Sequence, residues 1–170
     1  GSSIVAAMLI NGYKVIAFGP LAADLEQGPS RILRALEESY KQGIHQHDVQ
    51  QLHSGIVFTS NYADLRNCLL VVECVIENAD IKKKVFEQTE AVVTNDAIIT
   101  TNTSAIPIAI LQEELSHPGR FLGMHWAQPA FTTAFLEIIC GPKTDQSVAE
   151  SLCQTASGWG KEPILVRKDI

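Results

Sequence analysis

The most hydrophobic segment of the sequence, residues 69–76, constrains the fold more than any other feature. It reads LLVVECVI, is rich in β-branched residues, and has polar residues on both sides. Strands of parallel sheets have this composition because helices cover both faces of the sheet. The segment therefore predicts a short strand of a parallel sheet that is buried on both faces.

Strand and helix patterns alternate on both sides of this segment. A helix at residues 2–11 would end at Gly12, because glycine readily terminates a helix. Further helices are expected over residues 21–42, 79–94, 106–115 and 144–157, and further strands over residues 15–18, 56–59, 97–100, 121–124, 135–139 and 163–166. This order predicts an α/β fold with a mostly parallel sheet, in one domain that comprises residues 1–170.

Some local features of these helices can also be predicted. Gly28 and Pro29 should start or kink the helix at residues 21–42, and Thr144 is a good N-cap for the helix that follows it. The residues expected to face the core are Ile32, Leu33, Leu36 and Tyr40 in the first of these helices, and Ile81, Val85, Phe86 and Val92 in the helix at residues 79–94.

Composition and charge restrict the classes of function. Hydrophobic residues make up 46% of the chain and charged residues 19%, which is typical of a globular protein. The net charge of -6 argues against general nucleic-acid binding. The one basic run, residues 82–84, is expected to be a solvated surface first and an anion contact second. No signal peptide or transmembrane stretch is visible, so we expect no membrane partner.

The cysteines and histidines indicate no metal centre. The four cysteines form no CxxC pair, and most lie in or beside apolar runs, as reduced thiols of an intracellular protein do. A cytoplasmic location is therefore expected. His45, His47 and His53 lack the spacing and the cysteine partners of a zinc site, so a solvated loop is the expected structure there.

Polar side chains follow three of the predicted strands. Glu77, Ser104 and His125 each lie just beyond a strand end. Ligands of parallel α/β sheets bind outside the carboxyl ends of the strands. We therefore expect these residues to converge on a binding site at one edge of the sheet.

His125 has a candidate partner in the next apolar run. Glu137 is the one acid in the strand at residues 135–139, and an acid is costly to bury without a partner. A carboxylate on one imidazole nitrogen fixes the tautomer of the ring and suits it to general acid–base chemistry. On these residues alone, a catalytic pair and a hydrogen-bonded pair in the core both remain open.

Four short motifs resemble those of the L-3-hydroxyacyl-CoA dehydrogenases, in their N-terminal NAD-binding domain. The opening residues are similar to the second half of a Gly-x-Gly-x-x-Gly fingerprint, with Gly1 as its third glycine. VVECVIEN at residues 71–78 and TNTS at residues 101–104 resemble two further motifs. GMH at residues 123–125, with Glu137 after a spacing of 12 (137 − 125), resembles the catalytic stretch. The order of the motifs makes the resemblance specific, and it covers essentially the whole chain.

The resemblance implies a Rossmann-like, doubly wound fold and an NAD-dependent oxidation of L-3-hydroxyacyl-CoA to 3-oxoacyl-CoA. It implies that His125 is the general base that takes the hydroxyl proton and that Glu137 orients it. Ser104 would hydrogen-bond the reacting oxygen. The cofactor would meet Gly1, Glu77, Lys82 and Asn102, of which Glu77 and Lys82 would lie near the nicotinamide. An acyl-CoA substrate and a homodimer formed through a helical C-terminal domain are implied as partners.

The sequence also departs from the pattern of this family. Gly19 stands where the family has an acid that binds the adenosine ribose, although Asp24 or Glu26 could substitute for it. Gln128 replaces an asparagine after the catalytic histidine, and Ala105 replaces a second serine. The first strand and the C-terminal domain are expected to be missing from this chain, the latter beginning near its last residues, 168–170. The strands at residues 15–18 and 69–76 should then each have one unpaired edge and leave a gap between them, so that the isolated chain would aggregate or recruit a foreign strand.

Three alternatives to this function remain. One is a related dehydrogenase for another small hydroxy acid, of the lambda-crystallin or gulonate dehydrogenase type. The second is a catalytically silent nucleotide-binding module that keeps only the fold. The third is an α/β domain in which His125 and Glu137 are a satisfied core pair.

Overall fold

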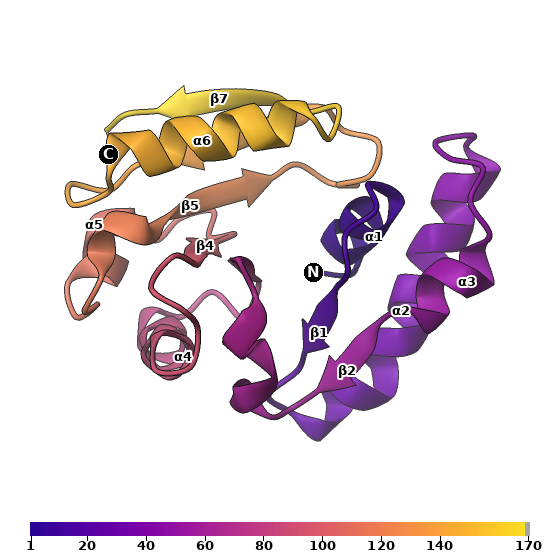
Figure 1. Cartoon of the computed structure of the whole chain (residues 1–170), viewed down its shortest axis with the longest axis horizontal. Coiled ribbons are helices and arrows are strands. Elements are labelled where there is room, and N and C mark those ends of the chain that lie inside the picture. Colours follow the sequence, from indigo (N-terminus) through magenta and orange to yellow (C-terminus); the bar gives the residue numbers. More distant parts are fainter. Residues whose placement is uncertain (169–170) are drawn as a thin grey trace. The chain divides into compact units, whose positions relative to one another are not determined.

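The computed structural model describes residues 1–168 and divides into two compact units (Figure 1). The first unit comprises residues 1–64 and 128–133, and the second comprises residues 65–127 and the chain from Ala134 onward. Asp169 and Ile170, near which a further domain was expected to begin, lie outside the described residues.

The first unit contains a two-stranded parallel sheet and three helices. Its elements are α1 (Ser2–Ile10), β1 (Ile16–Phe18), α2 (Ala22–Lys41), α3 (Val49–Ser54) and β2 (Val57–Thr59), followed by the 3-10 helix η1 (Tyr62–Asn67), which continues into the second unit. Strands β1 and β2 pair in register, with Ile16 opposite Val57. Gly12 adopts a φ of 83° just after α1, which confirms its predicted role as the helix terminator.

Three details of the first unit differ from the sequence-based predictions. Helix α2 runs continuously through Pro29, so the start predicted there is wrong. The fixed φ of proline is compatible with a helix, and helical residues on both sides offset the lost hydrogen bond. Tyr40 is 47% exposed rather than buried, whereas Ser39 is fully buried. His45 is buried as well, because its Nε2 lies 3.1 Å from the Ser39 hydroxyl, so it is not part of a solvated loop.

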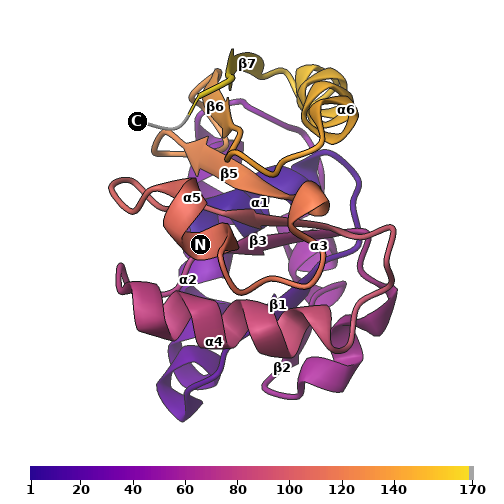
Figure 2. The same cartoon turned by 90° about the vertical axis from the view of Figure 1, so that its left-hand side faces the viewer.

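The second unit contains the main sheet, whose strand order is β3-β4-β5-β6-β7. Its elements are β3 (Leu70–Glu73), α4 (Ala79–Glu90), β4 (Ile98–Thr101), α5 (Ile108–Gln112), the 3-10 helix η2 (Pro118–Arg120), β5 (Phe121–Trp126), β6 (Phe135–Ile139), α6 (Gln146–Ser157) and β7 (Glu162–Val166). All neighbouring strands are parallel except β5 and β6, which are antiparallel. Figure 2 shows α4 running along the strands and α6 beside β6 and β7. The predicted α/β class with a mostly parallel sheet is confirmed.

Strand β3 is shorter than predicted. The carboxylate of Glu73 accepts a hydrogen bond from the backbone N–H of Val75, so the chain leaves the sheet directly after Glu73. Leu69 and Ile76, at the ends of the predicted strand, are 72% and 66% exposed. Among residues 1–168, β1 pairs only with β2 and β3 only with β4. The expectation that each of these strands has one unpaired edge is therefore confirmed.

Helix α4 turns a different face to the core than its hydrophobic residues suggested. Phe86 is fully buried as predicted, and its ring packs edge-on against that of Phe121, with 4.8 Å between the ring centres. Ile81 is 40% exposed, whereas its neighbour Lys82 is only 1% exposed. The prediction that the basic run is a solvated surface is therefore wrong for Lys82. This side chain is buried because it forms an ion pair with Glu73.

The N-cap of helix α6 lies one residue later than predicted. Asp145 occupies the N-cap position, and the Thr144 hydroxyl instead donates to the carbonyl of Phe121 at 2.7 Å. Thr144 therefore ties the start of α6 to β5 rather than capping the helix. None of the helices within residues 1–168 is both long and apolar enough to cross a membrane.

The Phe86 ring should be a main source of stability for the second unit. We expect Phe86→Ala to lower the free energy of unfolding by about 3–5 kcal/mol, the usual cost of removing a buried phenylalanine. Phe135→Ala is the matched control, because the Phe135 side chain is 41% exposed. Its cost should be below about 1 kcal/mol. Equal losses for the two variants in chemical denaturation would contradict this assignment of the core.

Candidate active site

The candidate site lies in the second unit, at the edge where three parallel strands end. Glu77 follows β3, residues 102–105 follow β4, and His125 lies at the end of β5. Because β3, β4 and β5 are parallel neighbours, their carboxyl ends share one edge of the sheet. The structure thus brings the three predicted strand-end residues to the same edge.

The antiparallel pairing of β5 and β6 places His125 opposite Glu137. The Nδ1 atom of His125 lies 2.7 Å from Oε2 of Glu137, which confirms the predicted contact. On the other side of the ring, Nε2 lies 3.1 Å from the Ser104 hydroxyl oxygen. An ionised carboxylate only accepts hydrogen bonds, so Nδ1 carries the proton and Nε2 is left as the acceptor. The ring therefore presents a proton acceptor next to a serine hydroxyl.

Glu137 is less buried than its apolar neighbours suggested. Leu136 and Ile138 are fully buried, while the side chains of Glu137 and His125 are 30% and 31% exposed. Successive residues of a strand face opposite sides, so Glu137 lies on the more open face of β6. The reason given for the pair, the cost of burying an acid, was therefore only partly right. Register is the stronger cause, because it places the two side chains next to each other.

Glu77 binds the loop that carries Ser104. Its Oε1 accepts hydrogen bonds from the Thr103 hydroxyl at 2.5 Å and from the backbone N–H groups of Ser104 and Ala105 at 3.0 and 3.1 Å. Partial burial alone would raise the pKa of Glu77. The three hydrogen bonds and the nearby Lys82 ammonium outweigh it and lower the pKa to about 2. Glu77 is therefore an anion held by the loop at residues 103–105.

Lys82 reaches this site from inside the core. Its Nζ lies 2.9 and 3.0 Å from the two carboxylate oxygens of Glu73 and 3.3 Å from the carbonyl of Val75. It also lies 3.3 Å from Oε2 of Glu77. Glu73 is a residue that the sequence analysis did not single out. A usable signal was present, because Glu73 is an acid within the most apolar strand, as Glu137 is in β6.

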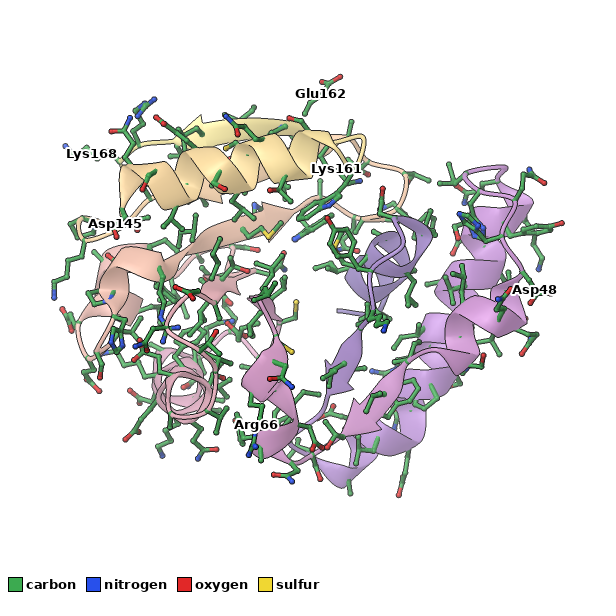
Figure 3. All side chains as sticks on the ribbon, in the orientation of Figure 1. Asp48, Arg66, Asp145, Lys161, Glu162 and Lys168 are labelled. Atoms are coloured by element: carbon green, nitrogen blue, oxygen red, sulfur yellow. The ribbon has the colours of Figure 1, made fainter. Side chains whose placement is uncertain are left out.

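Asn102 is engaged in the backbone of the site. Its Oδ1 accepts a hydrogen bond from the backbone N–H of Trp126 at 2.9 Å, which links the end of β4 to the end of β5. Trp126 stacks on Trp159 at 6.0 Å, and Nζ of Lys161 (labelled in Figure 3) lies 5.5 Å from the centre of the Trp126 ring. Burial lowers the pKa of Lys161. Trp126, the residue that follows His125, is therefore held by the hydrogen bond to Asn102 and by contacts with Trp159 and Lys161.

The first unit contains the remaining predicted cofactor residue, Gly1, at the N-cap of α1. The first turn of α1 has no acidic side chain, so its N–H groups can attract a phosphate group. Gln128, which replaces the family's asparagine, belongs to this unit too, and the Ser3 hydroxyl hydrogen-bonds its side chain.

The end of β1 shows how the chain accommodates Gly19. A Cβ atom at Gly19 would lie 2.5 Å from Cβ of Asp24, too close for any side chain without a shift. Asp24 is exposed, and its Oδ2 accepts a hydrogen bond from the backbone N–H of Leu21 at 3.2 Å. The Asp24 side chain thus fills the space beside the strand end. A helix N-terminus without acids and a carboxylate at this position fit the pyrophosphate and ribose of a dinucleotide.

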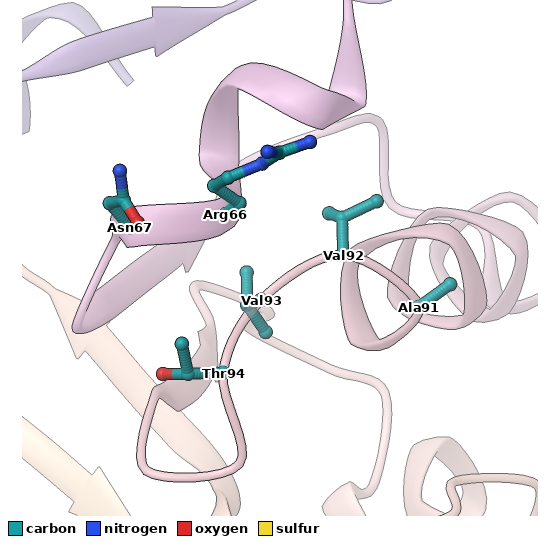
Figure 4. A pocket seen from close by; sticks show the side chains of 6 residues that line it. All are labelled: Arg66, Asn67, Ala91, Val92, Val93 and Thr94. Carbon is teal, nitrogen blue, oxygen red and sulfur yellow. The ribbon is translucent and has the colours of Figure 1, made fainter.

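Other hollows and clusters lie elsewhere. Figure 4 shows a hollow of about 460 Å³ lined by Arg66, Asn67 and residues 91–94. These residues precede β3 and β4, so the hollow lies at the opposite edge of the sheet from His125. A second hollow, of about 430 Å³, is lined by Tyr40 and residues 46–50. Within residues 1–168, no group of three or more histidine, cysteine or acidic side chains could hold a metal ion.

Comparisons with known proteins agree with these features. The family model described as "3-hydroxyacyl-CoA dehydrogenase, NAD binding domain" matches residues 1–170. A probable 3-hydroxybutyryl-CoA dehydrogenase of Deinococcus radiodurans is 30% identical over 164 residues, which are 96% of this chain and 59% of that protein.

Solved structures show the same relationship. The (S)-3-hydroxybutyryl-CoA dehydrogenase PaaH1 of Ralstonia eutropha superposes with a TM-score of 0.90 at 28% identity, over 100% of this chain and 60% of that one. An NAD-dependent dismutase, 5-formyl-3-hydroxy-2-methylpyridine 4-carboxylic acid 5-dehydrogenase, has a TM-score of 0.90 at 30% identity, over 100% of this chain and 55% of that one.

The chain spans about three fifths of the length of the Deinococcus relative, and the family model matches it from end to end. The chain therefore belongs to the 3-hydroxyacyl-CoA dehydrogenase family, whose NAD-binding, Rossmann-type domain it represents.

Proposed function

We propose that the protein oxidises L-3-hydroxyacyl-CoA to 3-oxoacyl-CoA, with His125 as the general base. The observation that carries this proposal is the position of His125 between Glu137 and Ser104, at 2.7 and 3.1 Å. A histidine held by a carboxylate on one side and facing a hydroxyl on the other is arranged to accept a proton from an alcohol.

Each side chain has a distinct task in this reaction. Nε2 of His125 takes the proton of the substrate hydroxyl, and the Ser104 hydroxyl holds the oxygen of that group in place. Glu137 fixes the tautomer and balances the charge of the imidazolium that forms. When bound, NAD would supply the chemistry that the side chains lack, which is acceptance of the hydride from the carbon that bears the hydroxyl group.

Dehydrogenases for other small substrates are a second candidate. The pyridine-carboxylate dehydrogenase, whose name gives a formyl compound rather than an acyl-CoA, is as similar to this chain as the hydroxybutyryl-CoA enzymes are, at 30% identity. Turnover of 3-hydroxybutyryl-CoA and of longer acyl-CoA substrates, compared with that of free hydroxy acids and of the formylpyridine carboxylic acid, distinguishes these candidates.

His125→Ala in the full-length protein should lower kcat by about two to four powers of ten, the usual contribution of a positioned general base. His117→Ala is the matched control, because His117 lies beside η2 with its side chain 51% exposed. The control should retain nearly all of its turnover. Near-normal turnover of His125→Ala would remove His125 from the mechanism, whereas a full-length wild-type protein without turnover would favour a nucleotide-binding module without catalysis.

Asp24 should set the preference for NAD over NADP, because residue 19, at the end of β1, is a glycine and provides no acid. Its carboxylate can bond the ribose hydroxyls and repel a 2′-phosphate. We expect Asp24→Asn to reduce the ratio of kcat/KM for NAD to that for NADP by about tenfold, as for the loss of one charged hydrogen bond. Glu26→Gln is the control, because Glu26 is the next acid along α2 and is also exposed.

Gly19→Asp alone does not test this point, because its Cβ would displace Asp24. The double variant Gly19→Asp/Asp24→Gly removes the Cβ atom that blocks residue 19, places the carboxylate at the strand end and should restore the preference for NAD. A larger loss of preference in Glu26→Gln than in Asp24→Asn would contradict the assignment.

A further inference from the structure

We propose that Glu73 is a positioning residue of this site: through the buried Lys82 ammonium it holds the Glu77 carboxylate, which in turn holds Ser104 against His125. This inference rests on the proposed function, because it concerns the same residues, and it assigns a task to a side chain that does not touch the reacting atoms. Four contacts in the second unit form the chain from Glu73 to His125.

The first step concerns the loop at residues 103–105. This loop lies between the end of β4 and the start of α5 and has no strand or helix of its own. Oε1 of Glu77 accepts its three hydrogen bonds, from Thr103, Ser104 and Ala105. Because the backbone N–H of Ser104 is one of these donors, the position of Glu77 determines where the Ser104 hydroxyl lies relative to Nε2 of His125.

The second step concerns what holds Glu77. Its side chain is 40% exposed and follows a strand that has already ended, so its own segment offers little restraint. Its second oxygen, Oε2, lies 3.3 Å from Nζ of Lys82. One carboxylate oxygen thus faces the loop and the other faces the ammonium, and a displacement of the ammonium would rotate the whole group.

The third step concerns what holds Lys82. Glu73 is 2% exposed at its side chain, and both of its oxygens contact Nζ, at 2.9 and 3.0 Å. The hydroxyl of Thr101 donates to Oε2 of Glu73 at 2.7 Å, and the backbone N–H of Val75 donates to Oε1. Glu73 is therefore fixed by strand β4 and by its own backbone, and it fixes Lys82 in turn.

The balance of charge gives the direction of the effect. Lys82 carries one positive charge and contacts two carboxylates, of which Glu73 is the closer. If Glu73 becomes neutral, Glu77 is the only anion that still contacts the buried ammonium within the described residues. Attraction between unlike charges is strong at a buried site, so the Glu77 carboxylate should move toward Nζ and away from the loop.

The test uses Glu73→Gln in the full-length protein, because glutamine keeps the shape of glutamate and removes its charge. The backbone amide proton resonances of Ser104 and Ala105 should move upfield as their hydrogen bonds to Glu77 weaken. The same variant should lose about ten- to a hundredfold in kcat/KM for the acyl-CoA substrate, the cost of misplacing a reacting group slightly.

Glu90→Gln is the matched control. The side chain of Glu90 is only 8% exposed, and it accepts two hydrogen bonds within the second unit, as Glu73 accepts two from Thr101 and Val75; those to Glu90 come from the backbone N–H groups of Ser116 and His117. It lies at the other end of α4 from Lys82. Any loss of stability in Glu90→Gln should leave the Ser104 and Ala105 amide resonances and the turnover unchanged. If Glu73 had a purely structural role, the variants Glu73→Gln and Glu90→Gln would behave alike.

Thr101→Val keeps the proposal testable if Glu73→Gln does not fold. It retains the charge of Glu73 and removes one hydrogen bond to it, so the same two resonances should move in the same direction by less. Unmoved resonances in folded Glu73→Gln, or in Thr101→Val where Glu73→Gln does not fold, would overturn the inference. The resonances are measured without substrate, so a wild-type protein that fails to oxidise any acyl-CoA would refute the proposed function and not this inference.

Discussion

The antiparallel pairing of β5 and β6 is the constraint on which the site depends. In a fully parallel sheet these two strands would have a long crossover between them, and their side chains would meet in a different register. Here His125 is directly opposite Glu137, and the two side chains point to the same face. The contact between a base and the carboxylate that orients it therefore follows from strand register rather than from a flexible loop.

Around this pair, hydrogen bonds and ion pairs of polar side chains replace the rigidity that regular structure would give. Asn102 joins the ends of β4 and β5, Glu77 holds the loop at residues 103–105, and Lys82 links Glu77 to Glu73. A buried ion pair adds little net stability, because removing two charges from water is costly. Its value in this protein is in placement: it holds a half-exposed loop at a fixed distance from His125.

Much of the fold could be predicted from the sequence, because burial leaves a periodic pattern. The strand expected at residues 97–100 is found at residues 98–101, and the first helix ends next to Gly12 as expected. The errors arise where a polar side chain is buried by a partner on a neighbouring segment of the chain. Lys82 was expected in solvent because three consecutive basic residues spread around the surface of a helix, whereas its partner Glu73 lies on the preceding strand. His45 was misplaced for the same reason, since Ser39 provides its partner.

The candidate site was predictable as a set of residues and not as a network. Position after a strand end indicated Glu77, Ser104 and His125, and the resemblance to a known family supplied their roles. Two of the three hydrogen bonds from the loop to Glu77, those from Ser104 and Ala105, had no sequence signal, because they involve backbone N–H groups that every residue except proline has. Residue 19 shows the opposite case. The sequence has a glycine where an acid was expected, but in the structure the Asp24 side chain occupies the space beside it.

The most direct test of the central claim, that His125 and Glu137 act as one unit, is a double-mutant cycle on kcat. The cycle compares His125→Ala, Glu137→Gln and the double variant in the full-length protein. If Glu137 works only by orienting His125, its substitution should lower kcat in the wild-type background and have almost no further effect once His125 is alanine. Full additivity of the two losses would contradict the account, because it would mean that the two side chains contribute to turnover independently.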